Sequence, residues 1–181
     1  MKKFAQLITL LTTCLTVSCF GEVLNENCIN QIQELITFNP PKGWKAADRK
    51  ELSPLIKTML IGSGKEDFPP TITLAVEPFE GTLKDYLKIV KNINDEQKTE
   101  WKNLGKMTTK AGVANLSQFD QKSNWGLVRT MTAILVKNGN AYILSATALK
   151  SEFSGFYKDF FEAMKSFSIE NGSAEKSDLR P

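Results

Sequence analysis

The segment LVRTMTAILVKNGNAYILSAT, residues 127–147, decides the fold of this chain. β-Branched residues occupy every second position from Val128 to Val136, and Ala133 is one of the residues between them. This period of two is that of a β-strand. Asn138-Gly139 ends the pattern, and these two residue types favour the positive φ angles of a two-residue hairpin turn. The sequence therefore predicts an antiparallel hairpin in which residues 140–147 return beside residues 127–137.

Two helices are predicted on either side of this strand-rich region. Thr82 is suited to cap the first, with Asp85 three residues later, and apolar residues then recur at helical spacing as far as Ile93. The second covers residues 151–167. Its broad apolar face is expected to anchor it to a sheet and comprises Phe153, Phe156, Tyr157, Phe160, Phe161 and Met164.

The order of these elements resembles that of a known superfamily. The residues that carry the likeness are Phe38-Asn39-Pro40-Pro41-Lys42-Gly43-Trp44, the hairpin segment 138–147 and the aromatic segment 160–167. Residues 34–170 resemble the Mog1/PsbP-like superfamily, which implies an α/β/α sandwich with a central, mainly antiparallel sheet. Its members act mainly as binding or assembly modules. The resemblance supplies no catalytic residue and no cofactor, and the metal sites of some members use histidine, which this chain lacks.

The first eighteen residues have the layout of a secretory signal peptide. Lys2 and Lys3 precede an apolar run from Phe4 to Val17, which is shorter than the roughly twenty residues that cross a bilayer. Cys19 follows at the end of the run, as in bacterial lipoproteins, so we expect lipidation of Cys19 and a lipid-anchored tether over residues 19–33. The tail, residues 171–181, has almost no apolar side chains and is expected to be disordered.

Two alternatives stay open for the cysteines. Leucine usually lies three residues before a lipidated cysteine, and here Thr16 has that place, whereas Leu11 is correctly placed for Cys14. Ordinary cleavage near Ser18 is the other alternative, and it leaves Cys19 and Cys28 free to form a disulfide. We favour lipidation of Cys19.

Composition excludes several classes of function. The chain has 23 basic and 20 acidic residues, and removal of Lys2 and Lys3 leaves 21 against 20, so nothing in its charge points to nucleic acid. It contains no histidine, which excludes Ser-His and Cys-His catalysis and the commonest zinc ligand. We therefore expect a protein that is not an enzyme and holds no metal or other cofactor.

Four side chains are weighed as binding residues. Trp44 and Trp101 are expected to pack against the domain itself, whereas Trp125, in the predicted turn Ser123-Asn124-Trp125-Gly126, is the candidate for a partner surface. Arg129 either binds an anion in a cleft or pairs across the sheet. The sequence leaves both uses of Arg129 open.

These observations predict a bacterial cell-envelope protein that is anchored to the membrane by its lipid and faces the periplasm. Its domain is expected to bind another envelope protein. The alternative is a carrier or sensor of a small apolar ligand, held in a pocket between sheet and helix.

Overall fold

The computed structural model describes residues 35–64 and 68–170. The predictions for the signal peptide with Cys14, for the tether with Cys19 and Cys28, and for the tail fall outside these residues. Among the described residues, no helix is both long enough and apolar enough to span a membrane.

The predicted hairpin is present as β7 (Gly126–Lys137) and β8 (Asn140–Leu149). Asn138 and Gly139 have φ angles of 51° and 71°, and Lys137 pairs directly with Asn140. The two-residue turn therefore sets the register of the central strands of the sheet.

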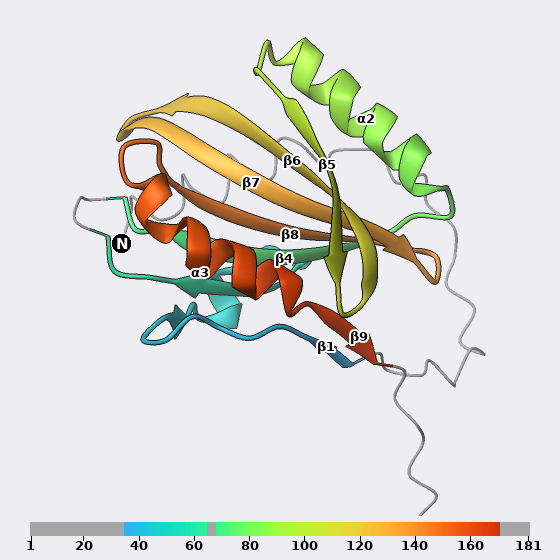
Figure 1. Cartoon of the computed structure of the whole chain (residues 1–181), viewed down its shortest axis with the longest axis horizontal. Helices are drawn as coiled ribbons and strands as arrows, with labels where there is room; N and C mark the ends of the chain where they lie inside the picture. The colour runs from blue at the N-terminus through green and yellow to red at the C-terminus, as the bar shows by residue number, and fades with distance from the viewer. Residues whose placement is uncertain (1–34, 65–67, 171–181) are drawn as a thin grey trace, which may run out of the picture.

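A seven-stranded antiparallel sheet is built outward from this hairpin, in the order β2-β3-β4-β8-β7-β6-β5 (Figure 1). The other strands are β2 (Lys45–Ala46), β3 (Ile56–Ile61), β4 (Thr71–Pro78), β5 (Lys102–Thr109) and β6 (Gly112–Ser123). A short 3₁₀ turn, Arg49–Glu51, lies between β2 and β3.

One face of the sheet is covered by helix α3 (Phe153–Lys165), which crosses in front of the strands in Figure 1. Met131, Ala133 and Leu135 point from β7 into the core that α3 closes, where Phe160 and Met164 are fully buried. This core is formed by every second side chain of β7 and by the side chains on one face of α3.

The opposite face carries helix α2 (Leu83–Glu96), whose N-terminus is capped by Thr82 as predicted. Tyr86 is buried there with Ile134 and Ala141, which occupy the alternate positions of β7 and β8. Helices on both faces of an antiparallel sheet make the α/β/α sandwich that the sequence predicts.

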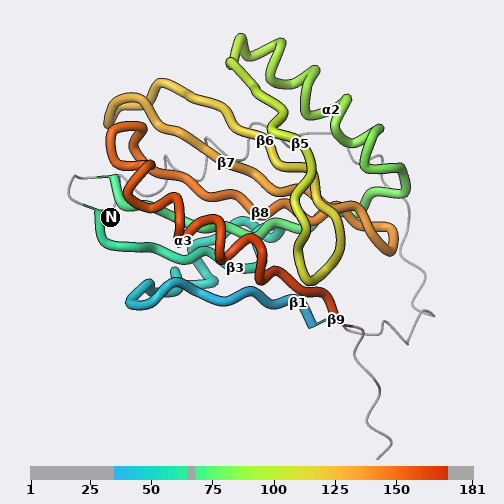
Figure 2. Tube along the Cα trace, in the orientation of Figure 1, coloured from blue at the N-terminus to red at the C-terminus, as the bar shows by residue number. Residues whose placement is uncertain are grey.

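A second, two-stranded sheet joins the ends of the domain. β1 (Leu35–Thr37) pairs antiparallel with β9 (Ser168–Glu170), and both run below the main sheet in Figure 2. The sequence pattern did not predict β9, because a three-residue strand has too few positions to show a period.

Candidate functional site

The space between α3 and the sheet is filled by side chains. Met131, Phe160 and Met164 have no exposed surface, and Tyr142 is only 1% exposed. Trp44 closes the edge of this core with edge-to-face contacts to Phe156 and Phe160, at ring-centroid distances of 6.3 and 5.9 Å. Trp44 therefore packs against the domain as predicted, and large buried side chains occupy the interface between the sheet and α3.

Trp125 lies in the turn between β6 and β7, as the sequence predicts, and its side chain is half-buried. Its ring is 5.5 Å from the ring of Phe68, and the two form a small cluster with Val128 and Leu149. Trp101 is also half-buried and follows α2, where its Nε1 is buried without a hydrogen-bond partner among the described residues. Trp125 thus has a packing partner within the domain, and its part in binding stays a prediction.

Arg129 makes its ion pair across the sheet. It lies opposite Asp120 in the β6–β7 register, with Nε donating to Oδ1 at 2.7 Å and Nη2 to Oδ2 at 2.9 Å. Lys150 adds a third contact, from Nζ to Asp120 Oδ2 at 2.9 Å. The Arg129 guanidinium, helped by Lys150 and opposed by partial burial, holds the pKa of Asp120 at about 2. Of the two roles that the sequence left open for Arg129, the structure shows the ion pair across the sheet.

The sequence held a signal for Asp120 that our prediction did not use. If residues 124 and 125 form a two-residue turn, Ser123 pairs with Gly126. Three positions further from the turn on each strand, Asp120 then lies opposite Arg129. The turn prediction therefore already contained this ion pair.

A line of three aromatic rings with a cation at each end runs along one flank of α3. The Arg129 guanidinium carbon lies 5.8 Å from the centroid of the Phe153 ring, and Tyr157 stacks on Phe161 at 5.6 Å with a 19° angle between the rings. The Lys165 ammonium lies 4.9 Å from the centroid of the Phe161 ring. We call these five residues, Arg129, Phe153, Tyr157, Phe161 and Lys165, the α3 ridge.

The exposure of the α3 ridge corrects one expectation. We expected Tyr157 to belong to the buried face of the helix, but it is 47% exposed. Phe153 and Phe160 are turned into the core, which places Tyr157 at the edge of the buried stripe and leaves one side of its ring in solvent. The spacing of Tyr157, Phe161 and Lys165, four residues apart, is the sequence signal for this surface line.

A shallow groove of about 320 Å³ lies beside the opposite flank of α3. Four of its lining residues are charged, and its members are Asn39, Pro40, Pro41, Lys110, Asp159, Glu162, Ala163, Lys165 and Ser166. Ligand pockets usually have volumes of about 300–1,000 Å³ and are lined mainly by apolar groups. This groove has the volume of the smallest such pockets but lacks their mainly apolar lining.

The chain was compared with known proteins. No family model matches it, and no curated protein matches it. Among solved structures, Mycobacterium tuberculosis LpqN, described as involved in cell envelope biogenesis, is 16% identical with a TM-score of 0.53, over 79% of this chain and 87% of LpqN. Saccharomyces cerevisiae Mog1p, described as a Ran-binding protein, is 16% identical with a TM-score of 0.50, over 75% of this chain and 93% of Mog1p.

The chain has the Mog1/PsbP-like fold. The PsbP of the cyanobacterium Synechocystis is also similar, at 12% identity and a TM-score of 0.47, over 85% of this chain and 98% of that protein. The similarity to LpqN and Mog1p confirms, at the level of the fold, the resemblance that the sequence suggests.

Proposed function

We propose that this chain is an exported, lipid-anchored protein of the bacterial cell envelope, facing the periplasm, whose Mog1/PsbP-like domain binds another envelope protein. The signal-like residues 1–18 and Cys19 support the anchor. The description of LpqN as involved in cell envelope biogenesis supports the location, and that of Mog1p as a Ran-binding protein supports a binding role.

The filled core is the observation that carries the binding role. A carrier of a small apolar ligand needs an apolar cavity, and the interface between α3 and the sheet is occupied by Tyr142, Phe160 and Met164. The groove beside α3 is polar and shallow. A partner protein needs only an exposed surface, so we prefer a binding module to the ligand carrier.

We propose no catalytic role for the domain. The chain has no histidine, and Arg129 and Lys150 both form ion pairs with Asp120. Such a network stabilises the folded state and offers no group poised for proton transfer.

The anchor is tested by intact mass and membrane fractionation of the full chain produced in a bacterial envelope. The unmutated protein and Cys28→Ala are expected to carry the acyl mass and to stay with membranes, whereas Cys19→Ala loses both. An unmutated protein without acyl mass that washes off membranes contradicts the anchor.

The binding role is tested separately, by chemical crosslinking in the native envelope followed by purification of the full chain. We expect one protein to be enriched reproducibly and to bind the purified chain again in isolation. Crosslinking that captures no such protein contradicts the binding role, whatever the result for the anchor.

A further inference from the structure

Tyr157 and Lys165 are the exposed members of the α3 ridge, and their side chains are already held in place. The Tyr157 ring is stacked on Phe161, and Phe161 is covered at its other end by the Lys165 ammonium. Immobilising a free side chain on binding costs conformational entropy, and a preformed stack avoids part of that cost. Tyrosine and arginine are also among the residue types that contribute most to protein interfaces.

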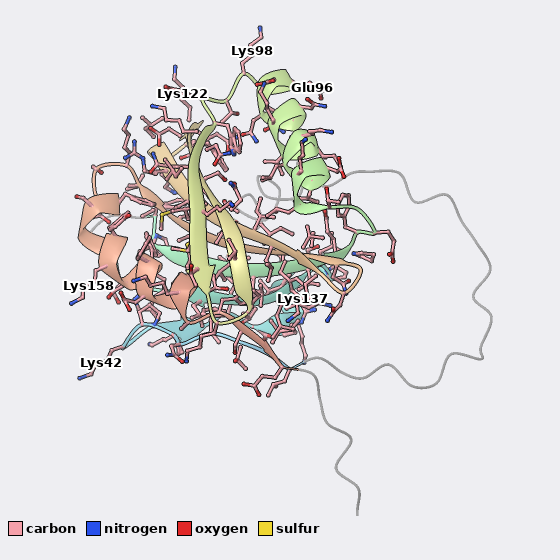
Figure 3. All side chains as sticks on the ribbon, turned by 45° about the vertical axis from the view of Figure 1, so that its right-hand side comes forward. Lys42, Glu96, Lys98, Lys122, Lys137 and Lys158 are labelled. Atoms are coloured by element: carbon pink, nitrogen blue, oxygen red, sulfur yellow. The ribbon has the colours of Figure 1, made fainter. Side chains whose placement is uncertain are left out.

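Positive charge is in excess along the same flank. Four cations lie on or beside the ridge, Arg129, Lys150, Lys158 and Lys165, against the two carboxylates that pair with them, Asp120 and Glu162. The Lys165–Glu162 contact is long, at 3.9 Å, and both side chains are at least half exposed. Lys158 makes no ion pair within the part of the chain that the structure describes, and it projects away from α3 in Figure 3.

From this arrangement we propose that the α3 ridge is the docking surface for an acidic face of a partner protein. The inference rests on the proposed function and specifies its site and the chemistry of the partner. Tyr157 supplies the apolar contact at the centre, and Lys158 and Lys165 supply the complementary charge at its border. Charges at the border of an interface act mainly on the rate of association and on the choice of partner.

An acidic protein explains the surface better than an anionic membrane does. Segments that bind anionic lipid usually have clusters of about 4–8 basic residues. This flank has an excess of only two positive charges, and Arg129 and Lys165 lie at opposite ends of the aromatic line instead of forming a cluster. A second copy of the chain is the remaining alternative, because α3 itself also carries acidic side chains, Asp159 and Glu162.

The experiment uses the full chain in its native envelope with a photo-crosslinking residue at Ser154, which is exposed on α3 one turn before Lys158. The control position is Lys84, exposed on α2 at the opposite face of the sheet. We expect a crosslinked protein at Ser154 and none at Lys84. The crosslinked protein is then identified and purified, and its affinity for the full chain is measured at low and high salt.

Two matched double variants test the chemistry. Lys158→Glu with Lys165→Glu reverses the charge beside the ridge, and Lys84→Glu with Lys106→Glu makes the same change in net charge at exposed positions elsewhere. We expect the first to lower affinity about tenfold or more and the second to change it by less than about twofold, since exposed charges act over about one Debye length. Tyr157→Ala is expected to weaken binding as well, and raising the salt to reduce it. Thermal unfolding checks that each variant is folded, and the single variant Lys158→Glu serves if the double variant is not.

Several results would overturn the inference. A partner whose affinity is unaffected by the reversal at Lys158 and Lys165 shows that its acidity is not recognised. A partner captured at Lys84 but not at Ser154 moves the site away from α3. If the chain crosslinks to itself, the partner is a second copy. If no protein is captured, and the chain binds anionic vesicles but loses that binding when Lys158 and Lys165 are reversed, the surface binds a membrane. The proposed function survives the first two results, whereas capture of no protein at any position contradicts that function itself.

Discussion

Asp120 and Arg129 face each other directly across β6 and β7, and both carboxylate oxygens accept hydrogen bonds from the same guanidinium. The pair lies where the sheet meets the start of α3, since the Arg129 guanidinium also lies over Phe153. One arginine therefore ties two strands and a helix together and begins the α3 ridge.

The first prediction concerns the dependence of stability on pH. The pKa of Asp120 is lowered from 3.8 to about 2 in the folded state, so its contribution is fully present above the unfolded value and is lost as pH falls from 3.8 towards 2. Asp120→Asn is expected to lower the free energy of unfolding at neutral pH by about 1–2 kcal/mol. Urea denaturation across this acidic range should show the difference from the unmutated chain shrinking towards zero.

Lys150→Ala is the control for the Asp120 prediction. The Lys150 side chain is 45% exposed, and exposed ion pairs contribute about 0–1 kcal/mol, so its loss is expected to cost less than the loss of Asp120. A difference between Asp120→Asn and the unmutated chain that stays constant down to the lowest pH would argue against the ion pair as its cause.

The second prediction uses the same substitution at two glycines. A Cβ at Gly62 would lie 2.6 Å from Trp44 Cε2, so Gly62→Ala is expected to displace the Trp44 ring and to cost about 1–3 kcal/mol. Gly155 is in α3 with nothing within 4 Å of an added Cβ, so Gly155→Ala is expected to add about 0.5–1 kcal/mol of stability. Urea denaturation should show opposite signs, and equal signs would contradict the prediction.

The third prediction tests the start of α2. Thr82 Oγ1 accepts a hydrogen bond from the Asp85 backbone N–H at 3.2 Å and donates one to Asp85 Oδ2 at 2.6 Å. Thr82→Ala removes both and is expected to destabilise the protein by about 0.5–2 kcal/mol, measured by thermal unfolding. Thr82→Ser keeps the hydroxyl and should retain most of the stability. If the serine variant loses as much as the alanine variant, the hydroxyl is not the stabilising group.

The fourth prediction separates packing from binding at Trp125. Its ring lies against Phe68 and is half-buried, so Trp125→Ala is expected to cost about 2 kcal/mol, less than the 3–5 kcal/mol of a fully buried aromatic. Leu104→Ala, at a side chain that is 49% exposed, should change stability by no more than about 0.5 kcal/mol. Affinity for the purified partner is measured on the same variants. Loss of affinity in Trp125→Phe, without loss of stability, would assign Trp125 to the partner surface.

Local signals allowed much of the fold to be predicted. The turn at Asn138-Gly139, the cap at Thr82 and the helical spacing of the aromatic residues in α3 each depend on residues a few positions apart. The period of two over residues 127–136 also predicted the strand β7. Each of these features is present in the structure.

The candidate site was predicted less completely, because its geometry depends on distant segments. The contact of Arg129 with Phe153 requires β7 and α3 to pack together, and no local pattern specifies that contact. The exposure of Tyr157 depends on how α3 is rotated against the sheet, which the burial of Phe153, Phe160 and Met164 decides. Helical spacing alone assigns Tyr157 to the same apolar face as these residues.

The sequence by itself determined the type and order of the main elements and the register of the central hairpin, because strand alternation, turn conformation and helix capping are local properties of the chain. The tertiary structure decided that the Arg129 guanidinium lies over the Phe153 ring and that Tyr157 faces solvent. It also decided that the space beneath α3 is full and that β9 returns to β1. These depend on how side chains from different elements fill one core, since close packing allows only one of the arrangements that the local pattern permits.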